Sequence, residues 1–123
     1  MAKEILLIED DHSLARTLSQ GLEANGYKVS LADNGKTGIE KAKDRPDLIL
    51  LDIMLPDEDG TEILKKIKAD EKIDDIPVVV LINKEDKETI SKILDAGGKE
   101  YLIKVDWSIE EIISKIEKFF KYS

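Results

Sequence analysis

The chain has 123 residues, of which 41% are hydrophobic and 37% charged, which suits one folded domain with a single hydrophobic core. Its net charge of −8 argues against direct nucleic-acid binding, which needs a clustered basic face. Cysteine is absent, which excludes disulfides, thiolate metal sites and cysteine nucleophiles, and without a signal-like or membrane-length apolar run we expect one cytoplasmic domain over residues 1–123.

Short apolar runs alternate with stretches of helical period along the chain. The predicted strands lie near residues 4–8, 28–32, 48–52, 78–82 and 100–103, and the predicted helices near 13–25, 35–44, 60–70, 86–96 and 108–121. This alternation is typical of a parallel sheet covered by helices on both faces.

Local signals mark the ends of two of these helices. Three leucines spaced four residues apart give the first helix its apolar stripe, and Gly26 follows where a left-handed C-terminal residue is favoured, so this helix should end near Asn25. Ser108 and Glu111 have the spacing of a capping box at the start of the last helix.

The predicted fold is α/β, a doubly wound (βα)5 flavodoxin-like three-layer sandwich with a parallel five-stranded sheet of order 2-1-3-4-5. Open sheets of this kind bind ligands beyond the carboxyl ends of their strands, where the strand order reverses. In this order the reversal lies between the first and third strands. These strands end at Glu9-Asp10 and at Asp52, so their carboxylates should meet at one point.

Acidic runs alone are weak signals in so acidic a chain. With 27 Asp and Glu among 123 residues, about one run of three acids is expected by chance. The runs at 9–11 and 57–59 could therefore be solvated loop acids. Their positions favour a functional role for the first run and for Asp52, because each comes directly after a run of apolar strand residues.

The acids at this edge suit a particular chemistry. Carboxylates are hard oxygen ligands, which favours Mg²⁺ or Mn²⁺, and a Ca²⁺ loop of the usual spacing is absent. Such an ion would offset the negative charge of a carboxylate and a phosphoryl group, so Asp52 could act as a nucleophile that forms an acyl phosphate. Lys104, at the end of the last strand, could contact the phosphoryl group.

Together these motifs resemble the receiver domain of bacterial response regulators. The matching segments are Glu9-Asp10, Asp52-Ile53-Met54-Leu55-Pro56 with Gly60, Ala96-Gly97, and Tyr101-Leu102-Ile103-Lys104. The resemblance covers the whole chain.

The resemblance implies a role for each matching site residue. Asp52 would be the phosphoacceptor and Lys104 the phosphoryl contact. The metal would be held by Asp10 as its main ligand, with Glu9, Asp52 and the backbone carbonyl of Met54. The chain would not be an enzyme beyond its own phosphorylation.

The resemblance also implies partners. The phosphoryl group would come from a histidine kinase, a phosphotransfer protein or a small acyl phosphate. A downstream protein would bind the face formed by the helix at 86–96, the strand at 100–103 and the last helix. We expect a monomer or weak homodimer that binds neither nucleic acid nor membrane directly.

Two positions depart from the family pattern around its aromatic switch, which would be Tyr101. The last strand-four residue is usually Thr or Ser but is Ile82 here, which has no hydroxyl to bond a phosphoryl oxygen. After Lys104 the usual cis proline is replaced by Val105, where a cis bond would cost roughly 2.5–4 kcal/mol. We therefore expect phosphorylation with weakened output.

The same departures keep an alternative open. The chain could be a pseudo-receiver or an engineered receiver-like scaffold that acts only as an interaction module. A third reading, a metal-dependent phosphatase, is disfavoured because Met54 stands where such enzymes place a second carboxylate.

Overall fold

The computed structural model describes residues 2–83, 86–104 and 108–122. Within these residues five strands alternate with five helices along the chain: β1 (Glu4–Ile8), α1 (His12–Ala24), β2 (Lys28–Ala32), α2 (Gly35–Ala42), β3 (Leu48–Asp52), α3 (Gly60–Ala69), β4 (Val78–Ile82), α4 (Lys87–Asp95), β5 (Glu100–Ile103) and α5 (Ile109–Tyr122). All five predicted strands are confirmed with the same bounds.

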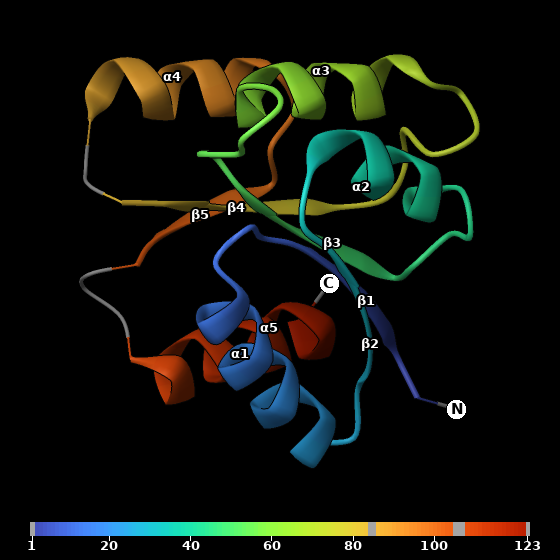
Figure 1. Cartoon of the computed structure of the whole chain (residues 1–123), viewed down its shortest axis with the longest axis vertical. Helices are drawn as coiled ribbons and strands as arrows, with labels where there is room; N and C mark the ends of the chain where they lie inside the picture. Colours follow the sequence, from blue (N-terminus) through green and yellow to red (C-terminus); the bar gives the residue numbers. More distant parts are fainter. Residues whose placement is uncertain (1, 84–85, 105–107, 123) are drawn as a thin grey trace.

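The strands form one parallel sheet in the order β2-β1-β3-β4-β5. Helices α1 and α5 cover one face of the sheet, and α2, α3 and α4 cover the other (Figure 1). The prediction of a doubly wound flavodoxin-like sandwich is therefore confirmed. None of the helices described combines the length and apolar character needed to cross a bilayer.

Each face of the sheet has its own apolar core. One core joins alternate residues of the strands to α2, α3 and α4, and includes Ile49, Leu51 and Val80. The other joins the remaining strand residues to α1 and α5, and includes Leu48, Leu50 and Leu81. Because β1, β3 and β4 are buried on both faces, their sequences are apolar at nearly every position.

The helix ends follow their capping residues. Asn25 caps α1, and Gly26 has a φ of 91°, with hydrogen bonds from Gly26 N–H to Glu23 O (3.0 Å) and from Tyr27 N–H to Leu22 O (3.1 Å). This pattern is a Schellman motif. At the start of α5, Ser108 and Glu111 make the two reciprocal bonds of the predicted capping box, each 3.2 Å long.

The predicted helix bounds are shifted by one or two residues. Helix α2 ends at Ala42 rather than at residue 44, because Lys43, Asp44 and Arg45 donate to the carbonyls three residues back and Arg45 then takes a φ of 59°. Helix α4 starts at Lys87 because Asp86 lies outside it as the N-cap.

Candidate functional site

Three polar side chains meet at the carboxyl edge of the sheet. Asp52 is the last residue of β3, while Glu9 directly follows β1 and Lys104 directly follows β5. Each continues the alternation of the strand residues that face α1 and α5. The backbone ladder also continues past the strands, because Glu9 N–H donates to Ala32 O (2.9 Å) and Lys104 N–H to Ile82 O (2.7 Å).

The predicted acids are brought together. Carboxylate oxygens of Glu9, Asp10 and Asp52 lie within 4.8 Å of one another, the one such acid group among the described residues. Glu9 and Asp52 are each only 2% exposed, whereas Asp10 is exposed. The site thus has a buried floor and an open side, as a centre that admits an outside reactant requires.

Lys104 joins two of these acids. Its Nζ lies 2.6 Å from Glu9 Oε1 and 3.1 Å from Asp52 Oδ2. Burial alone would lower the pKa of the Lys104 ammonium, but its hydrogen bond to Glu9 and the charge of Asp52 outweigh burial and raise that pKa. Lys104 therefore stays a cation beside Asp52, and its contact with a phosphoryl group stays a prediction.

The surroundings of Glu9 disfavour its charged form. Burial, and then its interaction with Asp52, raise the pKa of Glu9 to about 8. Its Oε2 atom is buried without a hydrogen-bond partner, although buried polar atoms are nearly always paired. Glu9, Asp10 and Asp52 offer carboxyl oxygens on one small site, and this donor set fits a hard divalent cation such as Mg²⁺, which would favour the charged form of Glu9.

The loop after β3 holds Asp52 in place. Met54 N–H donates to Asp52 Oδ1 (3.1 Å), and Met54 forms an isolated antiparallel bridge with Asp59. At Gly60, which donates to Ile53 O (2.8 Å), a Cβ would lie 2.6 Å from Ile53 Cα and 2.8 Å from Asp52 O. Only glycine lets the start of α3 approach the strand end so closely.

Comparison with known proteins identifies this constellation. Residues 5–117 match the family described as the response regulator receiver domain. The chain belongs to this family. The resemblance predicted from the sequence is confirmed.

Relatives of the receiver domain support the assignment. Response regulator MprA of Mycobacterium leprae is 35% identical over 118 residues, which are 95% of this chain and 50% of that protein. Transcriptional regulatory protein KdpE of Staphylococcus aureus is 36% identical over 117 residues, 94% of this chain and 49% of that protein. The chain therefore spans about half the length of these curated relatives.

Solved structures agree with the fold. A CheY-like receiver domain from Methanospirillum hungatei has a TM-score of 0.89 at 28% identity, covering 98% of this chain and 95% of that one. The phosphorylated cyanobacterial phytochrome response regulator RcpA has a TM-score of 0.87 at 32% identity, covering 99% and 96%.

The second acidic run of the receiver domain takes no part in the acid cluster. Asp59 caps α3, accepting from Thr61 N (2.8 Å) and Thr61 Oγ1 (2.7 Å). Asp57 accepts from the start of α2, and Glu58 pairs with Lys66 (2.7 Å). No role was predicted for these acids from the sequence, although Asp before a helical stretch is a known capping signal that could have identified Asp59.

The predicted switch residues pack into the apolar core on the side of α2, α3 and α4. Ile82 is 1% exposed and belongs to the core under α2, α3 and α4, and Tyr101 is half-buried against the same core. Ile82 pairs with Ile103 across β4 and β5. Val105 and the peptide bond that precedes it lie outside the described residues.

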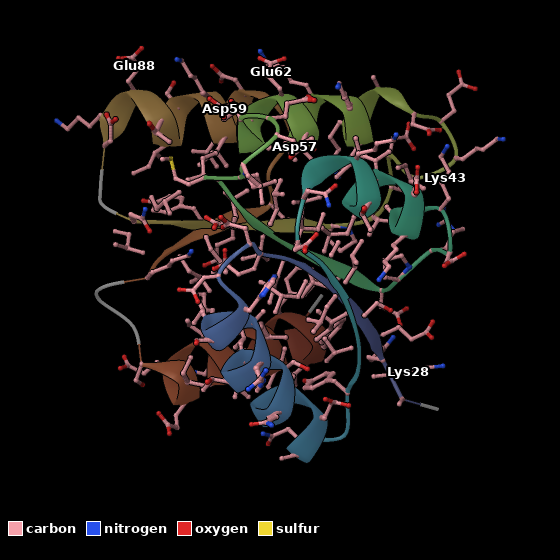
Figure 2. The ribbon with its side chains drawn as sticks, in the orientation of Figure 1. Lys28, Lys43, Asp57, Asp59, Glu62 and Glu88 are labelled. Carbon is pink, nitrogen blue, oxygen red and sulfur yellow. The ribbon has the colours of Figure 1, made fainter. Side chains whose placement is uncertain are left out.

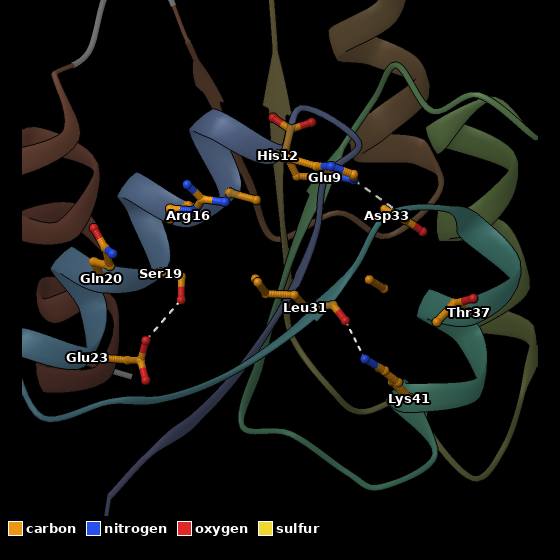
Figure 3. Close-up of a pocket in the computed structure, with 12 residues that line it drawn as sticks. Glu9, His12, Arg16, Ser19, Gln20, Glu23, Leu31, Asp33, Thr37 and Lys41 are labelled. Atoms are coloured by element: carbon orange, nitrogen blue, oxygen red, sulfur yellow. Dashed lines mark hydrogen bonds and ion pairs between the residues drawn. The ribbon is translucent and has the colours of Figure 1, made fainter.

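A cavity of ≈ 610 Å³ adjoins the site without containing it. It lies between α1, β2 and α2, where Glu9 reaches its upper end and His12 pairs with Asp33 at 3.4 Å (Figure 3). Asp52, Asp10 and Lys104 do not line it. The reacting groups therefore face the carboxyl edge of the sheet and not this cavity.

Proposed function

We propose that the chain accepts a phosphoryl group on Asp52 in a Mg²⁺-dependent reaction. The supporting observation is the convergence of Glu9, Asp10 and Asp52 within 4.8 Å, with Lys104 bonded to both buried acids. The donor would be a phosphohistidine of a histidine kinase or phosphotransfer protein, or a small acyl phosphate.

Asp10, Glu9 and Asp52 would hold the cation, with the backbone carbonyl of Met54. Mg²⁺, or Mn²⁺ in its place, would supply charge neutralisation between the attacking carboxylate and the phosphoryl oxygens. The unpartnered Oε2 of Glu9 supports this assignment, because a ligand or its bound water would satisfy it.

The residues of the chain act on Asp52 and on the incoming group. An Oδ of Asp52 attacks phosphorus, and an O–P bond forms as the bond from phosphorus to the donor nitrogen or oxygen breaks with its electron pair leaving on the donor. Met54 N–H fixes the carboxylate through Oδ1. Lys104, already beside Oδ2, stabilises the charge of the phosphoryl oxygens.

Response regulators interact with histidine kinases and with downstream effectors, and we propose that this chain passes its signal on through α4, β5 and α5. Ile82 is fully buried and has no hydroxyl to bond a phosphoryl oxygen, so phosphorylation of Asp52 is coupled only weakly to Tyr101. Weak coupling, rather than loss of phosphotransfer, is the expected effect of this substitution.

Intact mass after incubation with acetyl phosphate tests the proposal. We expect a gain of one phosphoryl group with Mg²⁺, little gain after chelation of divalent ions, and none in Asp52→Asn. Asp11→Asn, which changes an exposed acid that caps α1 and lies outside the acid cluster, is the matched control and should still be modified. An unchanged mass with Mg²⁺, or an equal gain in Asp52→Asn, would overturn the proposal.

A further inference from the structure

Asp57 joins the loop that follows the phosphorylation site to a different helix. Its Oδ1 accepts from Gly35 N–H (2.9 Å) and its Oδ2 from Lys36 N–H (3.2 Å). Figure 2 shows Asp57 between α2 and the start of α3. The bond from Gly35, more than any other cause, lowers the pKa of Asp57, so the carboxylate is ionised at neutral pH and complements the positive end of α2.

Asp57 is not the only residue that caps the start of α2. Asn34 is already the N-cap and accepts from Thr37 N–H (2.9 Å). Asp57 satisfies the two amides that Asn34 leaves, from a position 21 and 22 residues further along the chain. A local cap would serve α2 alone, whereas this contact also holds the loop.

The other contacts of this loop do not replace the link to α2. Its base is closed by Gly60 N–H to Ile53 O (2.8 Å) and by the bridge between Met54 and Asp59. Glu58 binds Lys66 of α3, the helix that the loop itself leads into. Among the described contacts, the two bonds of Asp57 are thus those that join the tip of the loop to α2.

We propose that Asp57 is a positioning residue for the metal site: by clamping the tip of the loop to α2, it fixes the backbone of Met54 beside Asp52. The inference rests on the proposed function, because Met54 is expected to offer its carbonyl to Mg²⁺ and its N–H already holds Asp52 Oδ1. A loop whose geometry is set in advance loses less conformational entropy when the ion binds.

Calorimetric titration of the full chain with MgCl₂ tests this role without relying on phosphorylation. Asp57→Ala should weaken Mg²⁺ binding about three- to tenfold, less than the roughly 10–100-fold cost typical of removing a group that bonds a metal ligand directly. Asp57→Asn should fall between Asp57→Ala and the unchanged chain, because its amide oxygen can accept one of the two bonds and its NH₂ group cannot accept the other.

Two controls separate positioning from simpler effects. Asn34→Ala removes the other cap of α2 and leaves the loop contacts intact, so it should lower stability without changing Mg²⁺ affinity. Glu58→Gln removes a neighbouring negative charge and leaves the link to α2 intact, so it too should bind Mg²⁺ normally. If either control weakens Mg²⁺ binding as much as Asp57→Ala, the positioning role is wrong.

Hydrogen exchange gives a second readout. Because coupling between two sites is reciprocal, Mg²⁺ should slow exchange at the Gly35 and Lys36 amides in the unchanged chain, and should do so less in Asp57→Asn. If the unchanged chain binds Mg²⁺ but Asp57→Ala and Asp57→Asn bind it equally well, only the positioning role fails. If the unchanged chain does not bind Mg²⁺, the proposed function fails with it.

Discussion

Ile82→Thr should restore the missing hydroxyl at a measurable cost in stability. Ile82 is 1% exposed in the apolar core beneath α4. The substitution removes the equivalent of two buried methylene groups, which costs about 1.6 kcal/mol at ~0.8 kcal/mol each. An unpaired buried hydroxyl adds about 1–3 kcal/mol, so the free energy of unfolding should fall by about 3–5 kcal/mol in total.

Urea unfolding of the metal-free protein measures this cost, with Ile82→Val as the matched control. The valine variant removes one carbon without adding a polar atom and should cost only about 0.5–1.5 kcal/mol. If Ile82→Thr costs no more than Ile82→Val, the environment of residue 82 is not the apolar one described above.

The same variant tests the proposed defect in output. In the phosphorylated protein the introduced hydroxyl can donate to a charged phosphoryl oxygen, a bond worth about 1.5–3 kcal/mol. Ile82→Thr should therefore change the lifetime of the phosphoryl group, measured by the decay of the added mass after Mg²⁺-dependent labelling, and Ile82→Val should not. Equal lifetimes in both variants, with unchanged partner affinity, would refute the reasoning.

Three further predictions concern the acid cluster and the loop beside it. Gly60→Ala should lower the unfolding free energy by about 1–3 kcal/mol, because the added Cβ meets backbone atoms that cannot rotate away; an unchanged urea midpoint would contradict this. Between pH 4.5 and about 8 the folded metal-free protein holds the proton of Glu9 that the unfolded chain releases, so the unfolding free energy should fall as pH rises through this window. Glu9→Gln should flatten that slope, and an identical slope in the variant would rule out Glu9 as its source. Free Mg²⁺ at ten times its Kd should raise the unfolding free energy by about 1.4 kcal/mol. This increment should be largely lost in Asp10→Asn but kept in Asp11→Asn, whose carboxylate caps α1, and equal increments in both would exclude Asp10 as a ligand.

Much of the fold could be predicted because each strand is a short apolar run with polar or turn residues at both ends. The meeting of Glu9, Asp10 and Asp52 followed from the same pattern, since the carboxyl ends of parallel strands share one edge. Helix ends were less predictable. The end of α2 depends on the left-handed backbone of Arg45, and an arginine does not signal that conformation in the sequence as a glycine such as Gly26 does.

Side-chain contacts over long separations could not be predicted. The position of Lys104 at a strand end was evident, but its double contact with Glu9 and Asp52 depends on side-chain rotamers. The bonds from Gly35 and Lys36 to Asp57 cross 22 and 21 residues of sequence and exist only because α2 and α3 pack on the same face. The roles of Ile82, Tyr101 and Val105 stay predictions.

The two separate apolar cores make the chain suitable for engineering one side at a time. Leu22 of α1 and Ile67 of α3 are both fully buried, but the whole sheet lies between them. Substitutions at two such distant positions should add to within about 0.3–0.5 kcal/mol. A library that varies α1 could thus be selected for new phosphoryl donors, while the opposite side of the sheet, with Ile82 and Tyr101, is kept constant.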